Sequence, residues 1–383
     1  MSKAPGRDAR EATIDRLPEL IAALPERERA LAERLFQVVV TEGEIEPPPG
    51  MEPWLERTFG SVAATRHQRI VRVMNRWTFE GATFNPLRSR RPGAGTTSAT
   101  PAADPPELRQ RIEGARGDDF CQPETRTPAD SFGRVRGAQT VTAANVAKAD
   151  GWHSVAIFAR HDPLALDEAQ VSDLLTTALE WARQARQSDP AARHFFLLWN
   201  CLWRAGASLI HGHAQMTLSH SMAHARVEGQ RAAAERYHIE TGGDFFSDLA
   251  EVHEALGLRT TPAHAVAGFA SLTPVKEREV TLLAFGAQIQ DLSRMAAPLW
   301  ETLRVALGVM GVRSFNVALY GPPFEVNESM VGWSRVPLVA RFVDRGAPLS
   351  PTSDIAALEL FGSSVISSDP FDVARTLRAN AAL

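Results

Sequence analysis

Long apolar runs, cysteines and an excess of one charge are all scarce in this chain, and each scarcity excludes a class of protein. No apolar run reaches the roughly eighteen residues that a membrane-spanning helix needs. Only Cys121 and Cys201 are present, so a framework of disulfides is not expected. The formal net charge of −4 gives no electrostatic attraction for a polyanion, and we expect neither a nucleic-acid nor a membrane partner.

The first residues also lack the apolar stretch of a secretory signal, since residues 1–8 lead directly into charged sequence. A cytoplasmic location is therefore expected. The composition, 44% hydrophobic and 22% charged, is that of an ordinary globular protein. A length of 383 residues exceeds what one core usually fills, so we expect two domains or one duplicated domain.

Apolar spacing predicts helices and strands that alternate along the chain. The first forty residues are predicted to be helical, with one apolar face that continues from Ile14 to Val38. Residues 93–106, rich in Gly, Thr, Ala and Pro, are predicted to be a mobile loop. Further helices are expected over 166–186, 221–240 and 289–307 and after 353 and 369, and strands near 155–158, 195–199, 264–272, 278–285, 314–320 and 336–343. Short strands of this kind, with helices between and after them, favour an α+β fold with antiparallel sheets flanked by helices.

Residues 210–216, Ile-His-Gly-His-Ala-Gln-Met, are the most informative segment because apolar and polar residues alternate strictly. In an extended strand this alternation places His211, His213 and Gln215 on one face and the apolar residues on the other. A neutral imidazole is a good nucleophile toward phosphorus, so His213 could carry a nucleotidyl group between two displacements. The alternative is a polar strand face with incidental histidines, since the chain has histidines elsewhere.

The neighbours of His213 suit the same chemistry. His211 and Gln215 could fix its tautomer or hydrogen-bond the non-bridging oxygens of a phosphoryl group. Ser208 and the small residues Gly206 and Ala207 lie just upstream, where a phosphate can approach the backbone closely.

Seven residues in this strand and in the segment before it form one set. They are Asn200, Gly206, Ala207, Ser208, His211, His213 and Gln215. Together they resemble the active-site signature of galactose-1-phosphate uridylyltransferase and its relatives, the nucleotidyltransferase branch of the histidine triad (HIT) superfamily. That branch has Gln where the hydrolase branches have a third histidine. Residues 84–87, Phe-Asn-Pro-Leu, with the arginines that follow, also resemble the family's Asn-Pro segment. The resemblance is strong from about Phe84 to Ser219 and weaker afterwards.

The resemblance implies a role for each of these residues. His213 would be the nucleophile, Gln215 would hold the phosphoryl oxygens of the covalent intermediate, and Ser208 would contact a substrate phosphate. Asn200 would anchor the loop or the phosphate end of the nucleotide, and Gly206 would permit the turn. For Asn200 and Gly206 a turn that merely enters a strand is an equal alternative.

The Asn-Pro segment would contribute substrate-binding residues, because the family's arginines lie near the nucleotide. Here these residues are Asn85, Arg88, Arg90 and Arg91. A solvated basic loop is the alternative interpretation of the arginines.

The resemblance also implies a structural zinc, which many relatives hold with a Cys-x-x-Cys pair and two histidines. In this chain Asp118 stands in the first position and Cys121 in the second. His161 or Asp162 would be the third ligand and His211 the fourth. An Asp, Cys, His, His set is able to bind zinc tetrahedrally, although Cys121 has the alternative of a small buried residue.

The second half is expected to be a degenerate copy of the first. We predict an N-terminal helical extension over 1–60, a catalytic HIT-like domain over 61–225 and a second HIT-like domain over 226–383. Val339 and Arg341 stand where the uridylyltransferase has iron-binding histidines, so no iron is expected. The second copy would help to wall the acceptor pocket, and the resemblance implies a homodimer.

The predicted activity is transfer of a nucleoside monophosphate between a nucleotide sugar, or a dinucleotide, and a phosphorylated small-molecule acceptor, through a covalent His213 intermediate. One alternative is a phosphorylase or hydrolase of nucleoside-diphosphate sugars or dinucleoside polyphosphates. Another is a nucleotide-binding protein without turnover. The presence of both His213 and Gln215 favours an enzyme, since a pure binder needs no nucleophile.

Overall fold

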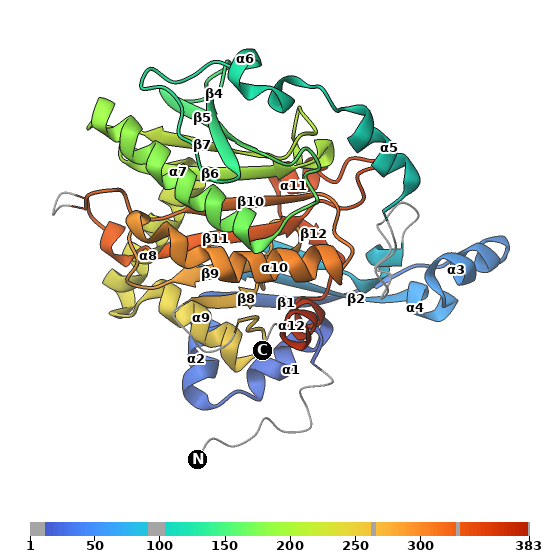
Figure 1. Ribbon diagram of the computed structural model, residues 1–383. Helices are drawn as coiled ribbons and strands as arrows, with labels where there is room; N and C mark the ends of the chain where they lie inside the picture. Colours follow the sequence, from blue (N-terminus) through green and yellow to red (C-terminus); the bar gives the residue numbers. More distant parts are fainter. Residues whose placement is uncertain (1–11, 91–103, 262–265, 327–329, 382–383) are drawn as a thin grey trace.

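Two antiparallel-rich sheets and the helices around them form the α+β structure of this chain (Figure 1). The computed structural model describes residues 12–90, 104–261, 266–326 and 330–381. Most of the predicted loop at 93–106 therefore lies outside the described residues. The α+β prediction is confirmed.

The larger sheet has eight strands in the order β4-β5-β7-β6-β10-β11-β9-β8, and all neighbouring strands in it are antiparallel. Outward from the central β6–β10 pair, the strands are β7, β5 and β4 on one side and β11, β9 and β8 on the other. The two halves of the sheet are therefore arranged alike, as a duplicated fold requires. The strands are β4 (Thr140–Ala144), β5 (Trp152–Phe158), β6 (His194–Cys201), β7 (His213–Ser219), β8 (Ala267–Ala270), β9 (Glu277–Ala284), β10 (Phe315–Tyr320) and β11 (Leu338–Asp344).

The side chains on one face of the central strands are buried, whereas those named below on the other face are partly exposed. Gln215, Leu198, Ala318 and Arg341 lie side by side across β7, β6, β10 and β11, and all four are half-buried. The residues between them along each strand point to the opposite face and are buried, because side chains alternate along a strand. We call the partly open face the trough.

Two long helices lie across the buried face, in front of the sheet in Figure 1. They are α7 (Glu168–Ser188) and α10 (Ala296–Gly308), which pack on each other. The Asp167 side chain caps α7 by accepting from the Gln170 N–H at 2.8 Å. Apolar residues of α7 recur every three or four positions and are buried, which confirms the helix predicted there. The helix predicted over 289–307 is a 3-10 turn, η7 (Ile289–Met295), followed by α10.

The N-terminal region corrects one prediction. Helices α1 (Leu17–Ala22) and α2 (Glu26–Leu35) form as expected, but the chain turns into strand β1 (Phe36–Glu44) where a helical face was predicted to continue to Val38. Val38, Val39 and Val40 are β-branched and favour a strand, and an edge with which to pair is available in β2.

The smaller sheet joins distant parts of the chain in the order β1-β2-β3-β12. Its other strands are β2 (His67–Asn75), β3 (Gly81–Phe84) and β12 (Ser364–Ile366), the last of which runs parallel to β3. The N-terminal extension thus contributes a strand as well as helices. The division of the chain at residues 60 and 225 stays a prediction.

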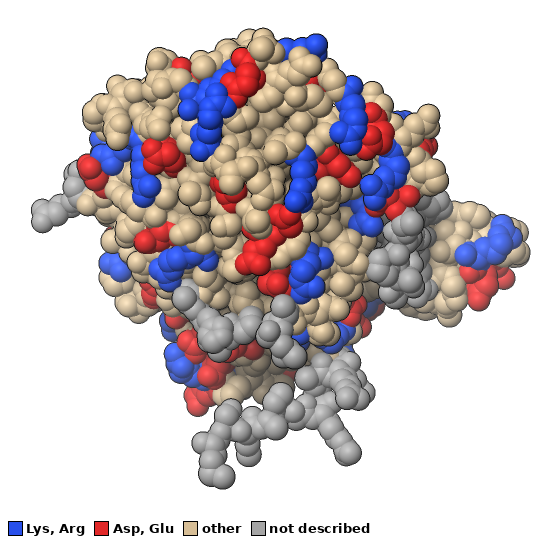
Figure 2. Space-filling model, viewed as in Figure 1, with Lys and Arg blue, Asp and Glu red and all other residues tan. Residues whose placement is uncertain are grey.

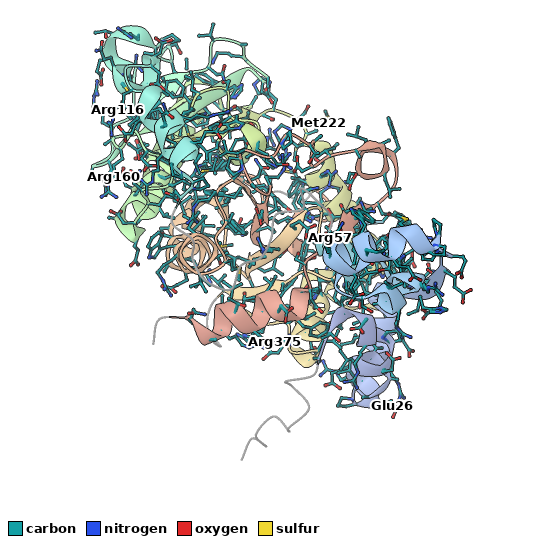
Figure 3. All side chains as sticks on the ribbon, turned by 90° about the vertical axis from the view of Figure 1, so that its right-hand side faces the viewer. Glu26, Arg57, Arg116, Arg160, Met222 and Arg375 are labelled. Atoms are coloured by element: carbon teal, nitrogen blue, oxygen red, sulfur yellow. The ribbon has the colours of Figure 1, made fainter. Side chains whose placement is uncertain are left out.

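The remaining elements lie around the two sheets. In Figure 1 α3 and α4 project to the right, and in Figure 3, where that side faces the viewer, Arg57 marks α3. These elements are α3 (Glu52–Phe59), α4 (Val62–Arg66), α5 (Pro106–Gly114), α6 (Pro123–Arg126), α8 (Ala225–Thr241), α9 (Phe245–Ala255), α11 (Ala357–Phe361) and α12 (Pro370–Ala379), with 3-10 turns η2 (Ile14–Arg16), η3 (Pro49–Met51), η4 (Pro86–Arg90), η5 (Asp119–Cys121), η6 (Trp203–Ala205) and η8 (Trp333–Arg335).

Two features of the described residues bear on membranes and on surface charge. None of the helices described is both long and apolar enough to cross a bilayer. Figure 2 shows basic and acidic side chains interspersed over the face it presents.

Candidate functional site

Strand β7 begins at His213, three residues later than the alternating pattern predicts. The preceding Gly212 is wedged against Phe158, where a Cβ on the glycine would lie 2.7 Å from the ring. This close approach bends the chain at His211. His213 and Gln215 therefore share the trough face, whereas His211 turns into a separate cluster of polar side chains.

His213 is held as a neutral imidazole, one nitrogen of which has no hydrogen-bond partner among the residues that the structure describes. Its side chain is buried, and burial lowers its pKa. Nδ1 lies 2.8 Å from the carbonyl oxygen of His211. A carbonyl only accepts, so Nδ1 carries the proton and Nε2 keeps its lone pair. The ring of Phe120 meets the imidazole edge to face with centroids 5.0 Å apart, which further restricts its rotation.

Gln215 is oriented by a residue that the sequence did not reveal, His153 on β5. The backbone N–H of Ala149 donates to Nδ1 of His153 at 2.9 Å, so the ring proton is on Nε2. That Nε2–H donates to Oε1 of Gln215 at 2.9 Å. With its oxygen occupied, Gln215 keeps its amide N–H groups for another acceptor.

The loop between β6 and β7 contains Gly206 and Ser208 and passes beside Asn200 at the end of β6. Gly206 has φ +98°, a left-handed conformation that glycine adopts without strain, and this supports the predicted turn. A Cβ on Gly206 would lie 3.9 Å from Nδ2 of Asn200, so the loop passes beside this amide. Gly206 and Ser208 are exposed and Asn200 is half-buried.

The predicted Asn-Pro segment packs near α3, and its asparagine is held by β2 and by the turn that follows it. Asn85 donates to Oε1 of Gln68 at 3.0 Å and accepts from the Leu87 N–H at 3.0 Å, at the start of η4. Arg88 is half-buried in η4. The side chain of Arg90 and all of Arg91 lie outside what the structure describes, so the substrate-binding role of the segment stays a prediction.

A second polar cluster lies behind His213 and contains the predicted metal ligands Asp118, Cys121, His161 and His211. One donor atom from each lies within 4.8 Å of the others. Sγ of Cys121 is 3.3 Å from Nδ1 of His161 and 3.4 Å from Nδ1 of His211, and the two nitrogens are 3.3 Å apart. The edges of a tetrahedral zinc site with nitrogen and sulfur ligands measure about 3.3 to 3.6 Å.

The tautomers of the two histidines suit a cation. Nε2 of His161 donates to the Ile112 carbonyl at 2.8 Å, and Nε2 of His211 donates to the Phe158 carbonyl at 2.7 Å. Both Nδ1 lone pairs therefore converge on the thiol, as in metal sites whose ligands are oriented by backbone carbonyls. Oδ2 of Asp118 is buried and has no hydrogen-bond partner among the described residues.

Of the two alternatives for the third ligand, His161 and Asp162, His161 is the one that belongs to this cluster. Asp162, the alternative to His161, instead pairs with Arg109 at 3.4 Å. Arg116 and Arg160, which are labelled in Figure 3, are close in sequence to Asp118 and His161, so they show at which end of the molecule the cluster lies. The four side chains can hold a metal ion, and burial keeps the pKa of His211 below its usual range and that of the Cys121 thiol above it.

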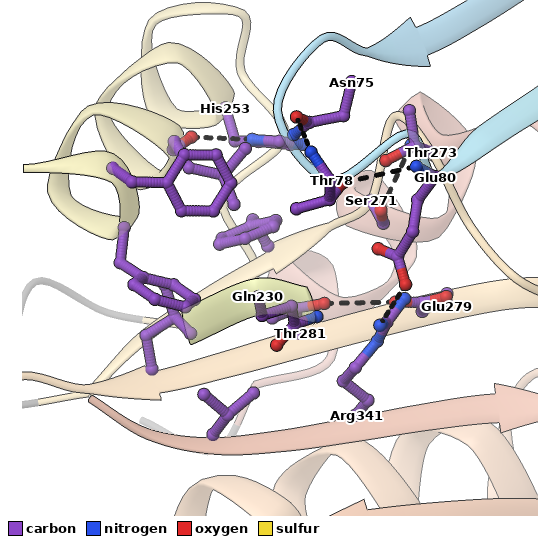
Figure 4. A pocket seen from close by; sticks show the side chains of 16 residues that line it. Asn75, Thr78, Glu80, Gln230, His253, Ser271, Thr273, Glu279, Thr281 and Arg341 are labelled. Atoms are coloured by element: carbon purple, nitrogen blue, oxygen red, sulfur yellow. Dashed lines mark hydrogen bonds and ion pairs between the residues drawn. The ribbon is translucent and has the colours of Figure 1, made fainter. Parts of the chain in front are cut away.

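At the far end of the trough a buried ion network occupies the corresponding place in the second half. By the strand order and register, Val339 and Arg341 on β11 correspond to His213 and Gln215 on β7. Arg341 donates to Glu80 and to Glu279, at 2.7 Å in each case (Figure 4). This strand has no histidine, so it offers no imidazole for iron.

Solved structures establish which fold this is. An ADP-glucose phosphorylase from Arabidopsis thaliana, solved with bound ADP-glucose, matches with a TM-score of 0.60 and 16% identity, covering 81% of this chain and 98% of its own. The chain has the fold of the uridylyltransferases and phosphorylases. A GalT-like protein from A. thaliana has a TM-score of 0.56 at 16% identity, over 70% of this chain and 93% of its own.

A structure described as a uridylyltransferase matches with a TM-score of 0.53 and 18% identity, over 68% of this chain and 90% of its own. No protein-family model and no curated protein sequence matches the chain. The predicted resemblance is thus confirmed at the level of the fold.

Proposed function

We propose that the protein is a nucleotidyltransferase that moves a nucleoside monophosphate between a nucleotide sugar, or a dinucleotide, and a phosphorylated acceptor. The observation that carries the proposal is that Nδ1–H of His213 is bound to the His211 carbonyl, which leaves Nε2 with its lone pair on the trough face. The fold shared with an ADP-glucose phosphorylase and a uridylyltransferase supports it.

The reaction takes two displacements at phosphorus. Nε2 of His213 attacks the α-phosphorus of the donor, and the bond from that phosphorus to the bridging oxygen breaks, which releases a sugar phosphate or nucleotide. The imidazole then carries a positive charge, which the Nδ1–H···O=C bond to His211 stabilises. An oxygen of the acceptor phosphate attacks the same phosphorus, and Nε2 leaves with its electron pair.

The amides of the site stabilise the phosphoryl oxygens. Gln215 accepts from His153, so its own N–H groups are available to an oxygen that becomes more negative in each transition state. Asn200, the Gly206 backbone and Ser208 would hold the adjoining phosphate, and Asn85, Arg88, Arg90 and Arg91 would contribute contacts from the Asn-Pro segment. These binding roles follow the sequence resemblance.

Asp118, Cys121, His161 and His211 would hold a structural zinc ion. A zinc ion held by these residues would link η5, the chain after β5 and the entry of β7 rigidly. His211 is the residue whose carbonyl orients His213, so the cluster would keep the nucleophile in place.

A phosphorylase is the second candidate, favoured by the ADP-glucose phosphorylase match, of which this chain covers 98%. In that reaction inorganic phosphate is the acceptor and the first displacement is unchanged. Both reactions use the adduct on His213, so the acceptor alone distinguishes them. The two-repeat division of the chain, over 61–225 and 226–383, is part of the same proposal.

The experiment uses UDP-glucose, ADP-glucose and diadenosine tetraphosphate as donors, with hexose phosphate or labelled inorganic phosphate as acceptor. We expect a ping-pong pattern with one donor, and exchange of labelled product into that donor. His213→Asn should abolish exchange, whereas the matched control His220→Asn, on an exposed histidine, should leave it intact. If no donor gave exchange, the enzymatic proposal would be wrong, and the protein would be a nucleotide-binding protein without turnover.

A further inference from the structure

Two asparagines face each other where the two halves of the large sheet meet. Asn200 on β6 lies opposite Asn316 on β10. Nδ2 of Asn316 donates to Oδ1 of Asn200 at 2.7 Å and to the carbonyl oxygen of Ala205 at 2.9 Å. Because a carbonyl only accepts, the nitrogen of Asn316 must be the atom that faces Ala205.

Arg345 fixes the same amide from its other end. Its Nη1 donates to Oδ1 of Asn316 at 2.7 Å, and a guanidinium has only donors. Asp354 holds Arg345 in turn, with Nε and Nη2 of the arginine 2.5 and 3.0 Å from its carboxylate oxygens. The side chains of Arg345 and Asp354 are only 13% and 15% exposed, so this pair is held in place by the surrounding protein.

The charge of Asp354 keeps the chain of hydrogen bonds running in one direction. Burial raises the pKa of this carboxyl, but the hydrogen bond and charge of Arg345, together with the charges of Lys276 and Arg204, lower it more, and the net pKa lies below its usual range. Asp354 is therefore an anion at neutral pH. The direction is fixed from Arg345 to Asn316 and from Asn316 to Asn200.

The hydrogen bond from Asn316 decides which end of the Asn200 amide faces the Gly206 loop. Oδ1 of Asn200 is occupied by Asn316, so the Nδ2 amino group is the end that remains for a ligand. Nδ2 is also the atom closest to the site of a Cβ on Gly206, so this amino group faces the Gly206 loop. A phosphate oxygen only accepts hydrogen bonds, so the N–H end is the one that binds it, whereas a rotated amide would repel it.

We propose that Asn316, held by Arg345 and Asp354, is a positioning residue that locks the Asn200 amide with its N–H groups toward the nucleotide phosphate. The second half of the chain thereby completes the nucleotide site of the first. This inference rests on the proposed function, because it requires that a nucleotide phosphate binds beside Gly206.

The test is a double-mutant cycle on nucleotide binding. Dissociation constants of UDP and ADP are measured by calorimetry for the wild type, Asn200→Ala, Asn316→Ala and the double variant. A lost hydrogen bond to a charged group weakens binding about tenfold or more, and we expect this in each single variant. The double variant should bind no more weakly than Asn200→Ala, because Asn316 acts only through Asn200.

Two further variants separate positioning from a loss of fold. Asn316→Asp has the same shape but presents only acceptors, so Asn200 should rotate and bind nucleotide more weakly than it does in Asn316→Ala. The matched control Asn380→Ala, near the end of the chain, should bind as the wild type does. Circular dichroism checks that each variant is folded. If Asn316→Ala does not fold, the binding constant of Asn316→Asp alone tests the positioning role.

The outcomes distinguish this inference from the proposed function. Additive losses in the double variant, or unchanged binding by Asn316→Ala and Asn316→Asp, would overturn the positioning role while the function stands. Wild-type protein that binds neither UDP nor ADP would overturn both.

Discussion

Arg341 is the residue whose removal should destabilise the fold most visibly. Its guanidinium joins Glu279, whose side chain is fully buried, to Glu80, which is 21% exposed. Arg341→Met leaves the Glu279 carboxylate with the Val275 N–H at 2.7 Å but without a cation. Removing one partner of a buried ion pair costs about 3 to 5 kcal/mol, and we expect a loss of that size in the free energy of unfolding.

The loss should depend on pH in a defined direction. Burial raises the pKa of Glu279, and without Arg341 its pKa rises further, so the folded variant favours the protonated acid. A raised pKa gives stability that is present at low pH and lost as the pH rises. Arg341→Met should therefore lie closer to wild type at pH 5 than at pH 8, by up to about 1.4 kcal/mol for each pH unit between the two pKa values.

Urea unfolding at pH 5 and pH 8 measures both effects. The double variant Glu279→Leu with Arg341→Met removes the unpaired charge, and we expect it to recover most of the loss. A single variant within about 1 kcal/mol of wild type at pH 8 would refute the reasoning. A double variant that is no more stable than Arg341→Met would also refute the reasoning.

Three further perturbations test separate parts of the structure. Cys121→Ser should lose stoichiometric zinc in a metal assay, whereas the control Cys201→Ser should keep it; no metal in either protein would contradict the zinc proposal. Burial raises the pKa of Asp369 to about 6, and this raised pKa costs the wild type stability above it. In thermal unfolding, Asp369→Asn should therefore gain stability relative to wild type as the pH rises through 6, by at most about 3 kcal/mol. Parallel pH profiles of the two proteins would contradict this. Gly206→Ala forces a side chain into φ +98° and should cost about 1 to 2 kcal/mol and weaken nucleotide binding; unchanged binding would contradict the place of this loop in the site.

The sequence predicts those parts of the site that depend on local spacing. Alternation places His213 and Gln215 on one face, and the spacing of apolar residues identifies α7. The turn at Gly206 is likewise local, since its φ of +98° is a conformation that glycine favours.

The remaining features depend on which strands pair, and single-sequence patterns do not contain that information. His153 reaches Gln215 only because β5 pairs with β7, and Asn316 reaches Asn200 only because β6 pairs with β10. The bend at His211 arises from the contact of Gly212 with the distant Phe158, against the local alternation. Strand β1 was missed because its apolar spacing also fits a helix.

The central claim is that His213 takes up the nucleoside monophosphate. Incubation with the correct donor, without acceptor, should leave an acid-labile and base-stable adduct visible by intact-mass spectrometry. The adduct should map to His213 and be absent from folded His213→Gly and His213→Asn. Turnover of a donor by the wild type without any adduct, or an adduct that persists in His213→Asn, would contradict the account.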